Sequence, residues 1–326
     1  MKVLVTGASG FVGSALVQRL LAGADVLGRP IDQLILVDQK FSEVADDPRL
    51  RYRAGDIASP AFLQSLAPQT LDVVFHLASV PGGAAEKDYA LGYAANLQAT
   101  ESLFGLLSRT ERPPVVVFAS TVAVYGAELP SRVDERTPLR PVMSYGTHKL
   151  MGELLLNDLS RRSLIDGRCL RLPGIVARPP QANGHVSAFM SDLFHLLRDG
   201  KPFTCPVSPD ATAWWMSVDC CVDNLLHAAR LPADRLGSTR VWQLPVLHLS
   251  LQTLFDAMAG LYGEDRRALV RWAPVEAVEA TFGRYPPLDT PTALALGFRH
   301  DGSTEALVRN ALRATAAPSS AAAQVG

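Results

Sequence analysis

Apolar and polar residues alternate along the first half of the chain in a rhythm typical of a parallel sheet covered by helices. Short apolar runs predict strands at residues 2–6, 33–38, 50–54, 73–77, 115–120 and 167–172. Between them, apolar residues recur at helical spacing over residues 11–21, 89–107 and 144–163. Residues 115–118 are apolar without alternation, as in a strand buried on both faces. This order predicts an α/β protein with a doubly wound parallel sheet, a Rossmann fold.

The rhythm changes after Leu172, where prolines separate shorter elements. Helices are predicted there at residues 187–199, 219–229 and 251–262. We therefore expect a dinucleotide-binding domain at residues 1–172. A smaller substrate-binding region is expected at residues 173–313, with elements that return to the sheet. Residues 314–326 are rich in alanine and serine and are predicted to form a disordered tail.

The composition limits which binding partners and which cellular compartment we expect for this protein. The 326 residues include 31 basic and 32 acidic side chains, so no strong field favours nucleic acid or an anionic membrane. No apolar stretch reaches the roughly 18 residues of a membrane span, and the first strand leaves no room for a signal peptide. The cysteines show no paired Cys-x-x-Cys spacing; they are Cys169, Cys205, Cys220 and Cys221. We therefore expect no metal and a cytoplasmic location.

A glycine-rich turn, TGASGFVG at residues 6–13, follows the first predicted strand and opens a helix. Gly7 allows a tight exit from the strand, Gly10 lets the backbone approach phosphates, and Gly13 lets the helix pack close to the sheet. Such a turn holds a dinucleotide pyrophosphate against the helix N-terminus. The contacts expected from this turn are made by Gly7, Ser9, Gly10, Phe11, Val12 and Gly13.

The ends of the later strands predict the rest of the cofactor site. Asp38 ends the second strand, where a carboxylate binds the adenosine ribose and disfavours a 2′-phosphate, so NAD is favoured over NADP despite Lys40. Asp56 and Ile57 are placed to bracket the adenine, although Asp56 could equally cap a helix. His76 is expected to be a buried strand residue. Further predicted cofactor contacts are Leu77, Ala78, Ser79, Asn96, Ser120, Pro173 and Val176.

Tyr145 and Lys149 stand four residues apart and therefore share one face of a helix. Free tyrosine, with a pKa of about 10, is a poor base at neutral pH, and a nearby ammonium group lowers that pKa. We predict Tyr145 as the catalytic base and Lys149 as its electrostatic partner and a ribose ligand. A third hydroxyl should hold the substrate oxygen, and Ser120 and Thr121 end the fifth strand in the right place. These parts together indicate nicotinamide redox chemistry.

The glycine turn and the segments FASTVAVYG (118–126), YGTHK (145–149) and WMSVD (215–219) resemble the extended short-chain dehydrogenase/reductase family, that is, the NAD-dependent epimerase/dehydratase family. The resemblance extends to about Arg313. It implies that Thr121 is the catalytic hydroxyl and that Ser120 contacts the nicotinamide side of the cofactor.

The same resemblance implies a homodimer held by a four-helix interface of the helices at 89–107 and 144–163. Apolar side chains beyond one core stripe fit this interpretation: Leu103, Leu106, Leu155 and Leu159. The alternative is that these leucines cover the sheet of their own subunit.

Residues 77–93, 144–156, 170–179 and 294–298 are similar to the D-erythronate dehydrogenases within this family. The similarity implies oxidation of the C2 hydroxyl of a small sugar acid. The chain departs from that group at Gly174, where a threonine is expected. Arg178 is the candidate for the substrate carboxylate, with Asn183 second, although Arg178 could equally be a surface arginine. The predicted substrate contacts are Ser79, Val80, Thr121, Tyr145, Gly174 and Arg178.

Two other functions are weighed against this one. A nucleotide-sugar dehydratase of this family carries Asp-Glu after the catalytic threonine, whereas this chain has Val122 and Ala123, which cannot move protons. Galactose-type epimerases carry an asparagine after the sixth strand, which is absent at residues 172–175. A non-catalytic NAD sensor would be expected to lack Thr121, Tyr145 or Lys149, and all three are present.

Overall fold

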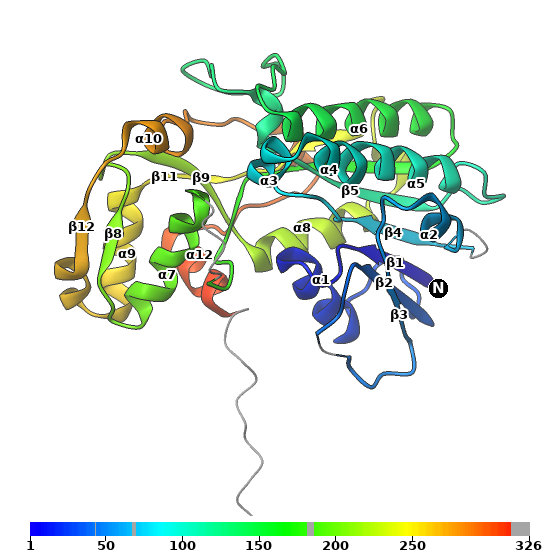
Figure 1. The fold of residues 1–326 in the computed structure, drawn as a ribbon, viewed down its shortest axis with the longest axis horizontal. Helices are drawn as coiled ribbons and strands as arrows, with labels where there is room; N and C mark the ends of the chain where they lie inside the picture. The colour runs from blue at the N-terminus through cyan, green and yellow to red at the C-terminus, as the bar shows by residue number, and fades with distance from the viewer. Residues whose placement is uncertain (43, 67–69, 181–185, 314–326) are drawn as a thin grey trace, which may run out of the picture. The chain divides into compact units, whose positions relative to one another are not determined.

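A computed structural model of the protein describes residues 1–42, 44–66, 70–180 and 186–313 (Figure 1). The predicted tail, 314–326, and Asn183 lie outside the described residues. The chain forms two compact units, which we describe one at a time. The first comprises Met1–Pro173, Cys221–Pro245 and Pro286–Arg299. The second comprises Gly174–Cys220, Val246–Tyr285 and the described residues from His300 onward.

The first unit is built on a seven-stranded sheet whose neighbouring strands are all parallel. The strand order is β10-β6-β5-β4-β1-β2-β3. The strands are β1 (Lys2–Thr6), β2 (Gln33–Asp38), β3 (Leu50–Ala54), β4 (Val73–His76), β5 (Val115–Thr121), β6 (Asp166–Leu172) and β10 (Val241–Gln243). The doubly wound sheet and its six predicted strands are confirmed. The order reverses between β1 and β4, which is where sheets of this type bind ligands.

Helices cover both faces of this sheet (Figure 1). They are α1 (Phe11–Leu21), α2 (Pro60–Gln64), α3 (Gly82–Lys87), α4 (Tyr89–Tyr93), α5 (Ala99–Leu107), α6 (Ser144–Arg161), α11 (Pro291–Ala295) and most of α8 (Val218–Arg230). A π-helical segment, Ala94–Gln98, joins α4 to α5, and a 3₁₀ turn, Val122–Tyr125, follows β5. In Figure 1, α4, α5 and α6 lie together on one face, and α1 and α8 lie on the other. Arg19 of α1 pairs with Asp223 of α8 at 2.5 Å.

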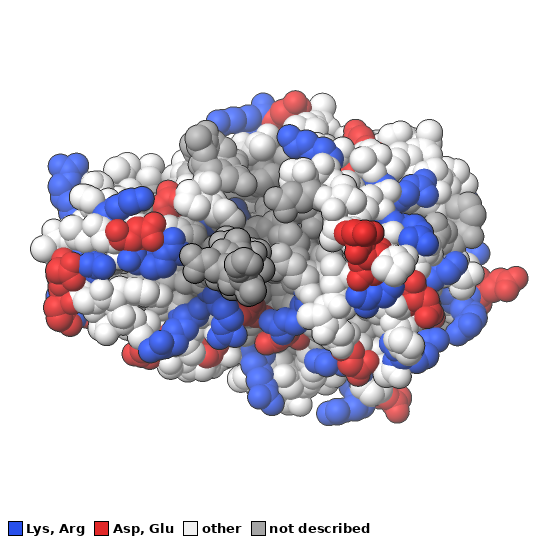
Figure 2. Space-filling model, turned by 90° about the horizontal axis from the view of Figure 1, so that it is seen from below, with Lys and Arg blue, Asp and Glu red and all other residues white. Residues whose placement is uncertain are grey.

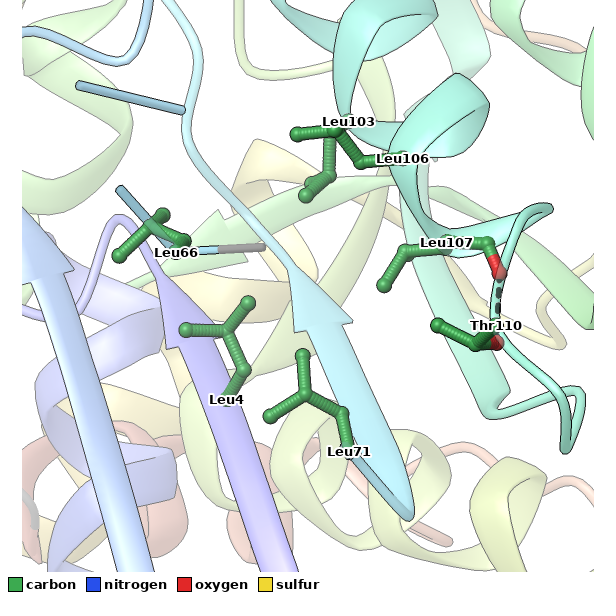
Figure 3. A pocket seen from close by; sticks show the side chains of 7 residues that line it. All are labelled: Leu4, Leu66, Leu71, Leu103, Leu106, Leu107 and Thr110. Atoms are coloured by element: carbon green, nitrogen blue, oxygen red, sulfur yellow. Dashed lines mark hydrogen bonds between the residues drawn. The ribbon is translucent and has the colours of Figure 1, made fainter. Parts of the chain in front are cut away.

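The core under α5 and α6 decides between the two interpretations of four leucines. Leu103 is only 2% exposed, and Leu106, Leu155 and Leu159 pack partly buried against the same core. The alternative interpretation therefore holds: these leucines lie on the sides of α5 and α6 that cover the sheet of their own subunit. A small apolar cavity remains in this core (Figure 3); it is lined by Leu4, Leu66, Leu71, Leu103, Leu106, Leu107 and Thr110.

The second unit holds two small sheets. One is three-stranded in the order β11-β9-β7, and the other pairs β12 with β8 in parallel. Its strands are β7 (Gly174–Val176), β8 (Phe203–Cys205), β9 (Thr212–Ser217), β11 (Leu247–Ser250) and β12 (Val270–Trp272). Its helices are α7 (Phe189–Arg198), α9 (Leu251–Tyr262), α10 (Glu276–Phe282) and α12 (Thr304–Arg313). Both Trp214 and Trp215 are buried, so each serves core packing.

The surface carries charges of both signs. On the face in Figure 2, basic and acidic side chains are interspersed rather than gathered by sign. Within the described ranges, every helix is too short or too polar to cross a membrane.

Candidate active site

The glycine turn forms a close-fitting cradle between β1, β4 and α1. Gly7 has a φ of 71°, and a Cβ atom there would lie 2.7 Å from the backbone nitrogen of Ala78. A Cβ on Gly13 would lie 2.0 Å from the carbonyl oxygen of Gly7. Gly10 precedes α1 and places no side chain over its first amides. The cradle therefore admits backbone only, and the open amides of α1 fit the pyrophosphate of a dinucleotide.

Asp38 stands beside this cradle, at the carboxyl end of β2. Its carboxylate accepts hydrogen bonds from the backbone amides of Ser9, at 2.8 Å, and of Gln39, at 2.7 Å. The carboxylate therefore lies at the edge of the turn, and its contact with an adenosine ribose remains a prediction. At the end of β3, the Asp56 side chain accepts from the amide of Ala58 at 2.9 Å, and Ile57 is buried in the core. Their adenine contacts remain predictions.

The floor of the site is a buried polar cluster around His76. The two ring nitrogens of His76 lie 2.7 Å from the Thr6 hydroxyl and 3.0 Å from the Thr100 hydroxyl. Burial, with a further contribution from Lys149, lowers the pKa of His76 to about 3, so the ring is neutral. His76 is thus the buried strand residue that the sequence predicts. Its ring stacks on Phe118, with the ring centroids 5.5 Å apart.

Asn96 holds the segment that follows β4 rather than lying exposed. Its side chain accepts from the amide of Val80 at 2.7 Å and donates to the Val80 carbonyl at 3.0 Å. Asn96 is fully buried and lies in the π-helical segment. Single-turn π segments often occur at functional sites. Here the segment fixes the backbone next to Ser79, which is exposed at the strand end.

Two local features position Tyr145 at the start of α6. The carboxylate of Glu86 accepts a hydrogen bond from the amide of Ser144, the first residue of the helix. Gly146 lets α6 approach the turn after β5, because a Cβ there would lie 2.6 Å from the Ala123 carbonyl oxygen. Tyr145 therefore lies beside the turn that Thr121 opens. The Thr121 hydroxyl accepts from the amide of Ala123 at 3.1 Å and keeps its own proton to donate.

Lys149 is buried below Tyr145, with 1% of its surface exposed. Its Nζ donates to the carbonyl oxygen of Ala119 at 2.9 Å. The same atom lies 4.7 Å from the Phe118 ring centroid and 5.9 Å from that of Tyr145. Burial lowers the pKa of Lys149 to about 8, while the neighbouring carboxylate of Glu153 acts in the opposite direction. The ammonium group is therefore protonated at neutral pH and lies within electrostatic reach of the phenol.

A buried ion pair beside Lys149 was not singled out from the sequence. Arg171 on β6 pairs with Glu153 on α6, with Nη2 2.8 Å from Oε2. Ser120, predicted to contact the nicotinamide, donates its hydroxyl proton to the same carboxylate at 2.5 Å. Arg171 also donates to the hydroxyl of Tyr125 at 3.3 Å. A signal for Glu153 is present, because Tyr145, Lys149 and Glu153 follow one another at helical spacing.

The remaining predicted contacts are Pro173, in the first unit, and three residues of the second unit. Pro173 is buried and is the last residue of the segment Met1–Pro173 of the first unit. A Cβ on Gly174 would lie 3.1 Å from both the Met190 methyl and the Trp214 carbonyl oxygen. Val176 is buried in the core of the second unit. Arg178 has an exposed side chain, and its backbone is held by Ser191 at 3.0 Å and His195 at 2.8 Å.

The doubly wound sheet and the glycine cradle define a dinucleotide-binding enzyme. Residues 3–239 match the family model described as the NAD dependent epimerase/dehydratase family. D-erythronate dehydrogenase of Cupriavidus necator is 38% identical over 95% of this chain and 97% of its own length. D-erythronate dehydrogenase of Haemophilus influenzae is 33% identical over 95% and 98% of the two chains.

A solved structure has a similar fold over nearly the whole chain. The chain is similar to a structure described as the nucleoside-diphosphate-sugar epimerase from Agrobacterium tumefaciens, with a TM-score of 0.91 and 32% identity over 96% of this chain and 94% of that one. The chain belongs to the NAD-dependent epimerase/dehydratase family. It is an NAD-dependent oxidoreductase.

Proposed function

We propose that the protein oxidises the C2 hydroxyl of a small sugar acid, D-erythronate in the first place, to the 2-oxo acid with NAD. The observation that supports this proposal is that the start of α6, which carries Tyr145 and the buried Lys149, packs against the turn that follows Thr121. The two D-erythronate dehydrogenases, which align over nearly the full chain, support this choice of substrate.

In the proposed reaction, Tyr145 takes the proton of the C2 hydroxyl. The charge of Lys149 stabilises the phenolate, because an opposite charge nearby favours the ionised form. Thr121 donates a hydrogen bond to the same substrate oxygen and holds it toward Tyr145. A bound NAD would supply the acceptor for the hydride that leaves C2. The cradle of Gly7 and Gly13 would hold its pyrophosphate, and Asp38 would hold its adenosine ribose.

Recognition of the acid needs a donor for its carboxylate, and we propose Arg178 for this role. Its side chain is exposed while its backbone is fixed at both the amide and the carbonyl, which suits a guanidinium group that must meet a ligand. Ser79, Val80 and Gly174 are the further proposed substrate contacts. Gly174 leaves room for the Met190 methyl in the space where a larger residue would project.

A nucleotide-sugar epimerase is the second candidate, because the similar structure from Agrobacterium tumefaciens is described as one. Purified protein should be assayed with NAD and a panel of four-carbon sugar acids, and separately with UDP-sugars. NADH formation with D-erythronate and NAD, with little NADPH when NADP replaces NAD, supports the proposal. No NADH from any acid, together with interconversion of a UDP-sugar, would replace the first candidate with the second.

We also propose that the protein is a homodimer that pairs through α4, α5 and α6. Although the leucines first suggested for this face are covered, other apolar side chains on it are exposed: Tyr89 is 60% exposed, Met151 46% and Leu154 65%. Met151 and Leu154 lie on one stripe of α6. Leu154→Glu should therefore give monomers in analytical ultracentrifugation, while Val275→Glu, at an exposed apolar residue of the second unit, should not. A monomeric wild type would refute the proposal.

The cytoplasmic location stays a prediction.

A further inference from the structure

The buried charge of Lys149 needs an opposite charge that the proposed mechanism does not provide. Lys149 is 1% exposed, and its Nζ donates a hydrogen bond to a neutral carbonyl group, that of Ala119. Removing an ammonium ion from water costs several kcal/mol unless a counter-charge compensates. A lysine in this position tends to lose its proton, and a neutral amine would not stabilise the phenolate of Tyr145.

The titratable groups around Lys149 come from several elements. His76 on β4 is neutral, because burial lowers its pKa to about 3. Cys169 on β6 is also neutral at physiological pH, because burial raises the pKa of its thiol well above the ordinary value. Burial likewise raises the pKa of Tyr125, in the turn after β5. Among the described residues, the charged groups that remain around Lys149 and Tyr145 are the cation of Arg171 and the carboxylates of Glu86 and Glu153. Glu86 binds the amide of Ser144 at the start of α6, whereas Glu153 acts on Lys149.

Glu153 is held too firmly to be an incidental neighbour. Its side chain is 2% exposed, and the Arg171 side chain is 12% exposed. Arg171 Nε lies 3.0 Å from one carboxylate oxygen and Nη2 lies 2.8 Å from the other, a two-point contact. The Ser120 hydroxyl adds a third donor at 2.5 Å. Donors from β5 and β6 thus fix a carboxylate one helical turn beyond Lys149.

We propose that Glu153, fixed by Arg171 and Ser120, is a positioning residue that keeps Lys149 charged and thereby sets how readily Tyr145 loses its proton. The hydrogen-bonded group of Glu153, Arg171 and Ser120 also connects three parts of the site. Ser120 precedes Thr121 on β5, Arg171 contacts the turn through Tyr125, and Glu153 lies on the helix that carries the base. This inference rests on the proposed role of Tyr145 as the base.

The test measures the ionisation of Tyr145 as a function of pH from the ultraviolet absorbance of tyrosinate. The signal of Tyr145 is obtained by subtracting the titration of the same protein that also carries Tyr145→Phe. This readout needs no turnover, so it is independent of the choice of substrate. Glu153→Gln should raise the midpoint of the Tyr145 titration by about one pH unit or more, the size expected for loss of a close charge effect. Asp158→Asn, which removes an exposed carboxylate of the same helix, should leave the midpoint unchanged.

Glu153→Gln leaves Arg171 buried without its partner, so that variant is at risk of misfolding. The double variant Glu153→Gln with Arg171→Met removes both charges and keeps the test available. It should also raise the midpoint, because Lys149 loses its counter-charge and no unpaired cation is left beside the phenol. A folded variant of either kind that titrates like the wild type would overturn the inference. Failure of the sugar-acid assay with a raised midpoint would refute the substrate and leave the role of Glu153 intact.

Discussion

A methyl group at Gly13 tests whether the close approach of α1 to β1 is what holds the cofactor. The new Cβ would lie 2.0 Å from the carbonyl oxygen of Gly7 and 3.0 Å from the Cα of Ala8. These are backbone atoms, so no side chain can turn aside to relieve the contact. Since real Cβ contacts stay at 3.0 Å or more, α1 and the turn must separate by at least about 1 Å in Gly13→Ala.

The cost to folding and the cost to binding differ in size. Overpacking of this kind costs about 1–3 kcal/mol, and replacing a helical glycine by alanine returns about 1 kcal/mol, so stability falls by about 0–2 kcal/mol. The amides of α1 move with the helix, and each hydrogen bond to a charged group contributes about 1.5–3 kcal/mol. Loss of one such bond raises the Kd for NAD by about 10- to 100-fold.

Calorimetric titration with NAD and thermal denaturation measure the two effects separately. The matched control is Gly105→Ala in α5, where an added Cβ meets no atom within 4 Å. That variant should bind NAD normally and gain about 1 kcal/mol of stability. A folded Gly13→Ala protein that binds NAD as tightly as the wild type would refute the role given to the cradle.

Two further predictions concern the charges of the site. Lys149→Met should abolish turnover yet raise the free energy of unfolding at neutral pH, because burial lowers the pKa of Lys149 from 10.5 to about 8, a cost of about 3 kcal/mol. The unfolded chain holds this proton more tightly, so the cost is present below about pH 8 and fades as the pH rises toward 10.5; denaturant titrations at neutral and alkaline pH would show whether the gain disappears. Asp38→Ala should weaken NAD binding by about tenfold and reduce the preference for NAD over NADP, as measured by fluorescence titration with NADH and NADPH. An unchanged preference would remove Asp38 from the ribose site.

The parts of the structure that depend on local pattern could be predicted from the sequence. The predicted strands, the glycine turn and the shared face of Tyr145 and Lys149 follow from periodicity and backbone geometry within a few residues. The burial of Leu103 could not be read in this way, because a wide apolar stripe on a helix looks the same whether it meets its own sheet or a second subunit.

The network around Glu153 depends on distant parts of the chain. Arg171 and Ser120 reach Glu153 only because β5 and β6 are neighbours under α6. The close approach at Gly146, which brings Tyr145 to the turn after Thr121, likewise depends on how a helix packs against a turn more than 20 residues away. The close approach of the Met190 side chain to Gly174 also joins residues that are distant in the sequence. Such contacts need the fold before they can be seen.

The most direct test is NADH formation from NAD and D-erythronate by the wild type and by Tyr145→Phe, with the Kd for NAD measured for both. We expect steady turnover by the wild type. We expect a loss of about 10²- to 10⁴-fold in Tyr145→Phe, the usual contribution of a positioned base, with NAD binding retained. A Tyr145→Phe protein that oxidises D-erythronate at the wild-type rate, or a wild type that forms no NADH with it, would contradict the account.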